Sequence, residues 1–246
     1  MKEYQNNIEI EKCFIEKQWK LANKINLKNC IKIDSIKYIG GVDLAYWKEN
    51  NCEYAVCCIV IVDYISKHIV EERYNIQMVE VPYISGCLAF REIPIVLETV
   101  KLLKIEPDLY VFDGNGYLHP RHMGLATHAG IVLNKPSIGI AKSYFKVLNT
   151  DYIEPANEKF AFEDIIIENE IYGRVVRTQK GVKPIFLSIG NKINLDTAMQ
   201  IVKDMTGNES HIPIPTRFAD IMTHKIRKKS KETKYEGAGN QYYSKA

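Results

Sequence analysis

The stretch that most constrains this fold covers residues 109–142, LYVFDGNGYLHPRHMGLATHAGIVLNKPSIGIAK. Two short apolar runs, each as long as a buried strand, flank a glycine-bracketed loop and a segment with helical periodicity. The first run ends in Asp113 and the second in Lys142. Because the order strand, helix, strand favours parallel pairing with a right-handed crossover, we expect a carboxylate and an ammonium group at the tips of neighbouring strands.

Upstream of this stretch, three runs rich in β-branched and aromatic residues are typical of strands, at residues 38–47, 54–64 and 69–78. Their connections are short enough for antiparallel hairpins. The sequence therefore predicts an α/β fold whose mixed central sheet has three antiparallel strands followed by parallel strands, flanked by helices.

Apolar spacing predicts the helices. They are expected at residues 4–24, 93–103, 124–133 and 195–205, with a last helix after Pro213 and Pro215 that holds Asp220. Pro94 is acceptable in the first turn of the second helix, which places Glu92 at its entrance. The segment after Tyr144 reads as charged and loop-like, with a strand pair at 172–178 and 183–188 that ends at Gly190.

With 246 residues and 46% apolar composition, the chain can bury one sizeable core, and we predict a single catalytic domain over residues 1–225. Residues 226–246 are expected to form a basic, flexible tail. The segment HKIRKKSKETK at 224–234 suits either a solvated helix end or an arm that contacts phosphates, and these interpretations are balanced. The net charge of only +3 does not by itself indicate a polyanionic partner.

Neither a leader segment nor an apolar run of the roughly 18 residues that a membrane span requires is present. A soluble, cytoplasmic protein without a membrane partner is expected, and a monomer is the simpler assumption. The six cysteines form no CxxC pair, which favours reduced thiols over a zinc site or disulfides.

Three acids occupy distinctive positions: Asp43 inside an apolar strand, Glu92 at a helix entrance and Asp113 at a strand end. In the predicted sheet the first and fourth strands are neighbours, so Asp43 and Asp113 lie side by side and Glu92 leans over them. Clustered carboxylates repel one another unless a hard cation such as Mg²⁺ or Mn²⁺ binds them, and such ions suit phosphodiester hydrolysis. Lys142 would place a positive charge beside the scissile phosphate. Each residue alone is more commonly a cap or a solvated surface group, whereas their joint placement favours a metal centre.

Five stretches carry a family resemblance: GGVDLAYW, VPYISGCLAFREIP, DGNGYLHPRHMGLATHAGIVLNKPSIGIAKS, GVKPIFLSIGN and PIPTRFAD. Together they span about residues 38–221, and they closely resemble endonuclease V, a family of metal-dependent nucleases with a ribonuclease H-like fold. The resemblance implies a DNA-repair hydrolase of the deoxyinosine 3′ endonuclease type. Such an enzyme recognises hypoxanthine and cleaves the second phosphodiester bond on its 3′ side, leaving 5′-phosphate and 3′-hydroxyl ends.

The resemblance also implies roles for single residues. The catalytic set is Asp43, Glu92, Asp113, Lys142 and His119, and the metal ligands are Asp43, Asp113, Glu92 and Asp220. Arg91 and Arg121 match basic residues near the nucleic-acid backbone. His119 and Asp220 also admit structural roles, because a histidine before proline is commonly a hydrogen-bonding staple in a loop, and either arginine alone can simply be solvated.

The loop Pro82, Tyr83, Ile84 and Ser85 matches the family's strand-separating wedge, which fills the gap left by an extruded base. The resemblance implies that the pocket for the flipped base is built from the backbone of Gly86, Leu88, Gly114 and Leu125. Ser85, Cys87, Asn115, Ile189 and Asn191 depart from the family's usual residues. A more flexible wedge tip is the expected effect of Ser85, and no role is assigned to the loop around Asn191.

Two other interpretations remain. One is a ribonuclease H-like nuclease for branched or hybrid substrates, which would cleave without regard to inosine. The other is a non-catalytic binder of inosine-containing nucleic acid, although a binder has no evident need for three repelling carboxylates. Whether DNA or RNA is preferred is not encoded in any residue we can identify, because that choice usually depends on contacts to the 2′-hydroxyl group.

Overall fold

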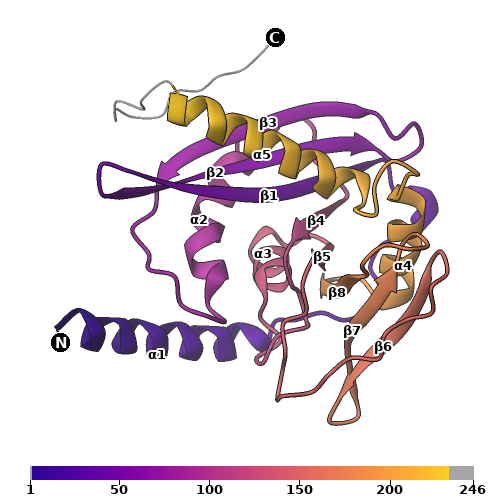
Figure 1. Cartoon of the computed structure of the whole chain (residues 1–246), viewed down its shortest axis with the longest axis horizontal. Helices are drawn as coiled ribbons and strands as arrows, with labels where there is room; N and C mark the ends of the chain where they lie inside the picture. Colours follow the sequence, from indigo (N-terminus) through magenta and orange to yellow (C-terminus); the bar gives the residue numbers. More distant parts are fainter. Residues whose placement is uncertain (1, 233–246) are drawn as a thin grey trace.

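The computed structural model describes residues 2–232 and contains one sheet of eight strands with helices on both faces (Figure 1). The helices are α1 (Lys2–Ala22), α2 (Leu88–Val100), α3 (Leu125–Leu133), α4 (Leu195–Met205) and α5 (Ile214–Glu232), with a short 3₁₀ helix at Ile33–Ser35. The strands are β1 (Tyr38–Glu49), β2 (Cys52–Asp63), β3 (Ile69–Met78), β4 (Leu109–Asp113), β5 (Ser137–Ala141), β6 (Ala161–Ile167), β7 (Glu170–Arg177) and β8 (Ile185–Asn191).

The strand order in the sheet is β3-β2-β1-β4-β5-β8-β7-β6. Strands β1, β2 and β3 pair antiparallel, whereas β4 runs parallel to both β1 and β5. The remaining strands, β8, β7 and β6, pair antiparallel. This arrangement confirms the predicted mixed sheet of the ribonuclease H-like fold, including the neighbouring position of the first and fourth strands.

The two faces of the sheet are covered by different helices, and side chains alternate between them along each strand. On one face, Ile39 and Val111 pack in a core with residues of α4 and α5. On the other face, Val42 and Phe112 pack with residues of α2 and α3. Figure 1 shows α5 crossing β1 and β2, in agreement with its many contacts to these strands. Whether a residue of β1 or β4 lies at an odd or an even position therefore decides which helices its side chain contacts.

The second helix differs from the predicted one. It begins at Leu88 and not near residue 93, so Pro94 lies well inside it and Glu92 lies in the helix body. Proline cannot donate the backbone hydrogen bond that this position would otherwise make, which weakens the sequence signal for a helix running through it. The helix is nevertheless stabilised by its apolar face, where Ile93 and Val96 are buried.

The C-terminal third also departs from prediction. Strand β6 lies in the segment that reads as loop-like, and β8 continues through Gly190 to Asn191. Helix α5 begins at Ile214, so Pro215 lies in its first turn, and it continues to Glu232 through the first residues of the predicted tail. Residues 233–246 of that tail lie outside the described part of the chain. Within residues 2–232, none of the helices is long and apolar enough to span a membrane.

Candidate active site

Three aspartates from three different elements converge beside the last residue of β4. The parallel register of β1 and β4 pairs Val42 with Phe112, so Asp43 and Asp113 come one position later on adjacent strands, on the face covered by α5. Asp220 reaches the same point from α5. Each residue offers a carboxylate oxygen, and these oxygens all lie within 4.8 Å of one another. The side-by-side placement of Asp43 and Asp113 expected from the sequence is therefore present in the fold.

Lys142 follows β5 on the same face, because Asp113 pairs with Ile140 and the lysine comes two positions later. Its Nζ lies 2.6 Å from Asp113 Oδ2 and 2.6 Å from Asp220 Oδ1. Although burial favours the neutral amine, these two carboxylates raise the pKa of Lys142 above its usual value. The side chain is still 45% exposed, so a charged ammonium group stands at the opening of the cluster.

The carboxylates of Asp43 and Asp113 are costly to ionise at this site. Burial raises the pKa of Asp43 to about 7, and the nearby Asp113 and Asp220 charges add to the effect, while a hydrogen bond from Thr223 opposes it. Burial also raises the pKa of Asp113, against the influence of Lys142. One ammonium group facing three carboxylates leaves an excess of negative charge that a divalent cation would neutralise.

Thr223 is a member of the site that sequence reasoning missed. Its Oγ1 lies 2.6 Å from Asp43 Oδ2 and 2.8 Å from the carbonyl oxygen of Asp220, and the side chain is fully buried. Position 223 is one helical turn after Asp220, so the spacing places both on neighbouring parts of α5. The spacing in the sequence therefore identifies Thr223 as a neighbour of Asp220, but the contact of Thr223 with Asp43 depends on the packing of α5 against β1.

Glu92 lies outside the three-aspartate group in the described part of the chain. Helix α2 packs on the opposite face of the sheet from α5, where residues of β1 that alternate with Asp43 point. The Glu92 carboxylate accepts a 2.8 Å hydrogen bond from the hydroxyl of Tyr46, a second contact that the sequence did not reveal. Burial raises the pKa of Glu92 to about 8, with further contributions from the charges of Asp43 and Asp113. The charges of Asp43 and Asp113 therefore influence the pKa of Glu92, although Glu92 is not one of the three grouped acids.

His119 is buried, and both ring nitrogens bond to the backbone. Nε2 lies 2.9 Å from the carbonyl oxygen of Gly86, while Nδ1 accepts from the amides of Arg121 and Met123 at 3.2 and 3.3 Å. Burial and the charge of Arg121 lower the pKa of His119 to about 4, so the ring is neutral at pH 7. This geometry matches a hydrogen-bonding staple more closely than a group that exchanges protons with a substrate.

The two predicted backbone-contacting arginines already make contacts within the protein. Arg91 is buried, pairs with Glu53 at 2.8 Å and donates a 2.9 Å bond to the carbonyl oxygen of Val81 at the start of the wedge loop. Arg121 donates through Nε to Gln18 at 2.6 Å and through Nη2 to the carbonyl oxygen of Gly86 at 2.9 Å. Their observed contacts support the wedge loop and the turn that follows it.

The predicted wedge is a surface loop between β3 and α2, and Tyr83 at its tip is 70% exposed. Beside it lies a groove of about 780 Å³ lined by residues of the loop, of β3 and of the turn between β1 and β2, including Met78, Tyr83 and Arg91. Ser85 is also exposed. An exposed tyrosine next to an open groove has the freedom that insertion between bases requires.

The predicted base-pocket residues lie at the beginnings of two helices. Gly86 and Leu88 flank the N-cap of α2, and Leu125 is the first residue of α3, directly beside Gly114. Neither helix is capped by the side chain of its N-cap residue. Gly86 has φ +73°, a backbone conformation that favours glycine. Of the departures from the family pattern, Cys87 is buried beside Arg121, and Asn191 bonds the backbone of Asn26 and Gly130.

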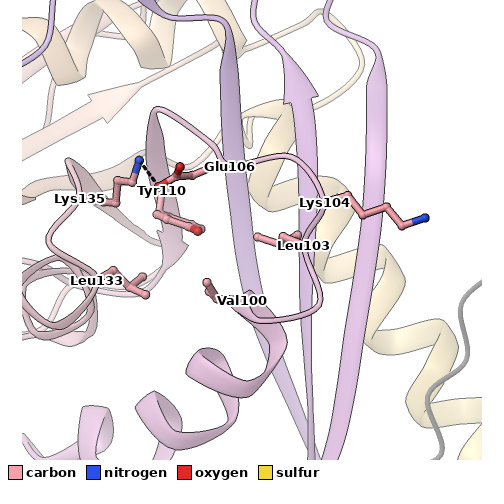
Figure 2. A pocket seen from close by; sticks show the side chains of 7 residues that line it. All are labelled: Val100, Leu103, Lys104, Glu106, Tyr110, Leu133 and Lys135. Atoms are coloured by element: carbon pink, nitrogen blue, oxygen red, sulfur yellow. Dashed lines mark ion pairs between the residues drawn. The ribbon is translucent and has the colours of Figure 1, made fainter.

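A separate cavity of about 250 Å³ lies between α2, α3 and β4 (Figure 2). Its lining includes Tyr110, Leu103 and Leu133, with an ion pair of 2.7 Å between Lys135 and Glu106 at its edge. None of its lining residues is one of the acids described above or Lys142. We therefore assign it no part in the candidate active site.

Comparison with known proteins gives one consistent result. The family model for Endonuclease V matches residues 19–221. The chain is 54% identical over 219 residues to the Endonuclease V of Bacillus thuringiensis subsp. konkukian, which covers 89% of this chain and 93% of that protein. It is 50% identical over 217 residues to the Endonuclease V of Bacillus subtilis, covering 88% of this chain and 91% of that protein.

Solved structures agree. The crystal structure of the Bacillus subtilis Endonuclease V is 48% identical and has a TM-score of 0.88, covering 91% of this chain and 94% of that one. The Ciona intestinalis Endonuclease V, solved in complex with a 24mer DNA containing an inosine followed by a ribo-adenosine, is 32% identical with a TM-score of 0.81. That comparison covers 90% of this chain and 99% of the Ciona chain.

Proposed function

Because this chain belongs to the endonuclease V family of nucleases, we propose that it recognises a hypoxanthine base flipped out of nucleic acid and hydrolyses the second phosphodiester bond 3′ to it. The products would carry 5′-phosphate and 3′-hydroxyl ends. The observation that carries the proposal is the cluster formed by Asp43 of β1, Asp113 at the end of β4 and Asp220 of α5, with Lys142 directly after β5. The inosine-containing DNA bound by the Ciona relative supports the choice of substrate.

We propose Mg²⁺ as the cofactor, with Mn²⁺ also supporting activity. The donor set fits such an ion, because three carboxylate oxygens within 4.8 Å of one another offer the hard ligands that Mg²⁺ prefers. Asp43, Asp113 and Asp220 would hold the ion, with Glu92 as the adjacent fourth carboxylate. When bound, the metal lowers the pKa of an attacking water and stabilises charge on the leaving oxygen.

Side chains of this protein supply the other proposed contributions to catalysis. Lys142 places its ammonium group beside the scissile phosphate, where its partly exposed position lets it face a substrate oxygen. Glu92, which accepts a hydrogen bond from Tyr46 and whose pKa burial raises to about 8, is the carboxyl group that could exchange a proton near neutral pH. His119 acts by positioning the backbone around Gly86 and not by proton transfer.

Recognition of the base takes place on the neighbouring surface. The wedge of Pro82 to Ser85 fills the gap left in the stack, with Tyr83 as its inserting residue. The backbone of Gly86, Leu88, Gly114 and Leu125 lines the proposed pocket, and the glycines there allow the main chain to approach the base closely. We propose that the protein acts as a monomer on DNA, with inosine-containing RNA as a further substrate.

The test is nicking of an inosine-containing duplex by the wild type, Asp43→Ala and Asp113→Ala in Mg²⁺ and then in EDTA. We expect both variants, and the wild type in EDTA, to lose nicking while DNA binding is largely kept. Asp151→Ala is the matched control, because this aspartate is exposed and pairs only with Lys146 among the contacts of the described chain. Full nicking by both site variants would refute the mechanism.

The same assay distinguishes the second candidate, a ribonuclease H-like nuclease for branched or hybrid substrates. Its basis is the shared fold and the acid cluster, which do not by themselves select a base. Equal cleavage of matched duplexes with and without inosine would favour it over the leading proposal.

A further inference from the structure

Gln18 is a polar side chain with 0% exposure on α1, a helix outside the central sheet. Both the nitrogen and the oxygen of its side-chain amide make hydrogen bonds. Nε2 donates to the carbonyl oxygens of Gly86 at 2.8 Å and of Met123 at 3.3 Å, and Oε1 accepts from Arg121 Nε at 2.6 Å. These partners lie 68 to 105 residues away in the chain. A fully paired, buried glutamine at such a junction has a single favoured orientation.

The carbonyl oxygen of Gly86 is the point where these contacts meet. It accepts from Gln18 Nε2 at 2.8 Å, from His119 Nε2 at 2.9 Å and from Arg121 Nη2 at 2.9 Å. Gln18 thus acts twice on this oxygen, once directly and once by orienting the guanidinium of Arg121. A carbonyl group held by three donors cannot rotate without breaking several buried hydrogen bonds, each costly to leave unmade.

The peptide group held in this way links the wedge loop to α2. The amide of Cys87 bonds the carbonyl oxygen of Ile84, which closes a turn directly after the wedge tip, and Leu88 then begins the helix. Gly86 itself is held at φ +73°. Rotation of this peptide would therefore change both the direction of the wedge and the aim of the first amides of α2.

A glutamine in this position also docks α1, and that role alone would explain its burial. The packing of α1 has another anchor, however, because Phe14 stacks on Phe90 of α2 with ring centroids 4.1 Å apart. The hydrogen bonds of Gln18 go instead to the turn beside the base pocket. Docking by itself would not require them to converge on the one carbonyl oxygen that His119 and Arg121 also hold.

We propose that Gln18 is a positioning residue for base recognition, which fixes the Gly86 carbonyl group so that the base pocket and wedge are preorganised before substrate binds. The inference rests on the proposed function, because it assigns Gln18 to the pocket of that site. This role gives α1 an indirect part in base recognition, although none of the residues of α1 is expected to touch the base. Preorganisation lowers the ordering cost of binding, so its loss appears in affinity for the specific substrate.

The experiment compares the wild type, Gln18→Met and the control Glu16→Ala, an exposed position of the same helix. The dissociation constants for two duplexes that differ only in inosine or adenosine at one position are measured in EDTA, and kcat and KM for inosine nicking in Mg²⁺. We expect Gln18→Met to lower the inosine preference about tenfold and to raise KM with little change in kcat, as loss of hydrogen-bonded positioning predicts. Glu16→Ala should behave like the wild type.

Because the preference is a ratio, it does not depend on the fraction of folded protein. An unchanged ratio for Gln18→Met would overturn the inference even if the variant were less stable. If Gln18→Met does not fold, Gln18→Glu gives the same test, since it keeps an acceptor for Arg121 but loses both donors and should also lower the ratio. If the wild type itself shows no inosine preference, the proposed function fails, which is distinguishable from failure of the role of Gln18.

Discussion

Replacing Thr223 by valine tests whether Asp43 must be ionised, because valine keeps the shape of the side chain but removes its hydroxyl donor. Thr223 Oγ1 lies 2.6 Å from Asp43 Oδ2, and a hydrogen bond to a charged group contributes about 1.5–3 kcal/mol. At about 1.4 kcal/mol per unit, losing it raises the pKa of Asp43 by about 1–2 units above its value of about 7.

The expected consequence depends on pH. At pH 7 about half of the Asp43 carboxyl groups are ionised in the wild type, and a rise of 1–2 units lowers that fraction about 5–50-fold in Thr223→Val. The Mg²⁺ concentration for half-maximal nicking should rise by a similar factor at pH 7. At pH 9 the difference should shrink to about twofold or less, because Asp43 is then largely ionised in both proteins.

Thr216→Val is the matched control. Thr216 is buried in the same helix, and its hydroxyl likewise bonds the carbonyl oxygen three residues earlier, at Pro213, but it contacts no acid of the cluster. The Mg²⁺ titration is run for both variants at pH 7 and pH 9 and at constant ionic strength. Equal shifts in the two variants, or a shift of the same size at both pH values, would refute the reasoning.

Three further predictions follow from the site. Burial raises the pKa of Asp43 from 3.8 to about 7 and that of Glu92 from 4.5 to about 8, so between these values the folded state binds protons that the unfolded state has lost. In EDTA the free energy of unfolding should therefore fall as pH rises from about 4.5 to 7. Denaturant titrations should show a shallower fall in the Asp43→Asn, Glu92→Gln double variant; an unchanged slope would contradict the assigned shifts. Lys142→Met should slow single-turnover nicking at least about 100-fold, while binding of inosine DNA measured by fluorescence anisotropy changes much less, because its charge acts at the phosphate; a near-normal rate would exclude that role. Tyr83→Ala, at a 70% exposed position, should change stability by less than about 0.5 kcal/mol but slow nicking of duplex more than of single-stranded inosine DNA, since only the duplex must be unstacked; equal effects on both would argue against a wedge.

Much of the fold follows from local patterns. Strands β1, β2 and β3 and helix α4 lie close to their predicted positions, because runs of β-branched and aromatic residues and a helical spacing of apolar residues are local signals. The adjacency of Asp43 and Asp113 also follows, since few sheet topologies suit three hairpin strands and then a parallel crossover. The shifted start of α2 and the unpredicted β6 show the limit of this approach, because a proline inside a helix and a charged edge strand both depend on tertiary packing.

The family resemblance, the mixed sheet and the principal acids can all be predicted from the chain alone, since each depends on residues close together in the sequence or on their order. Three features depend on how the helices pack: Glu92 lies on the face opposite α5, Thr223 and Tyr46 donate hydrogen bonds to buried acids, and Gln18 reaches Gly86 from α1. These contacts join elements up to 180 residues apart in sequence. Their physical basis is the packing of helices on particular faces of the sheet. Periodicity along one segment does not predict which distant side chain will donate a hydrogen bond to a buried carboxylate or carbonyl group.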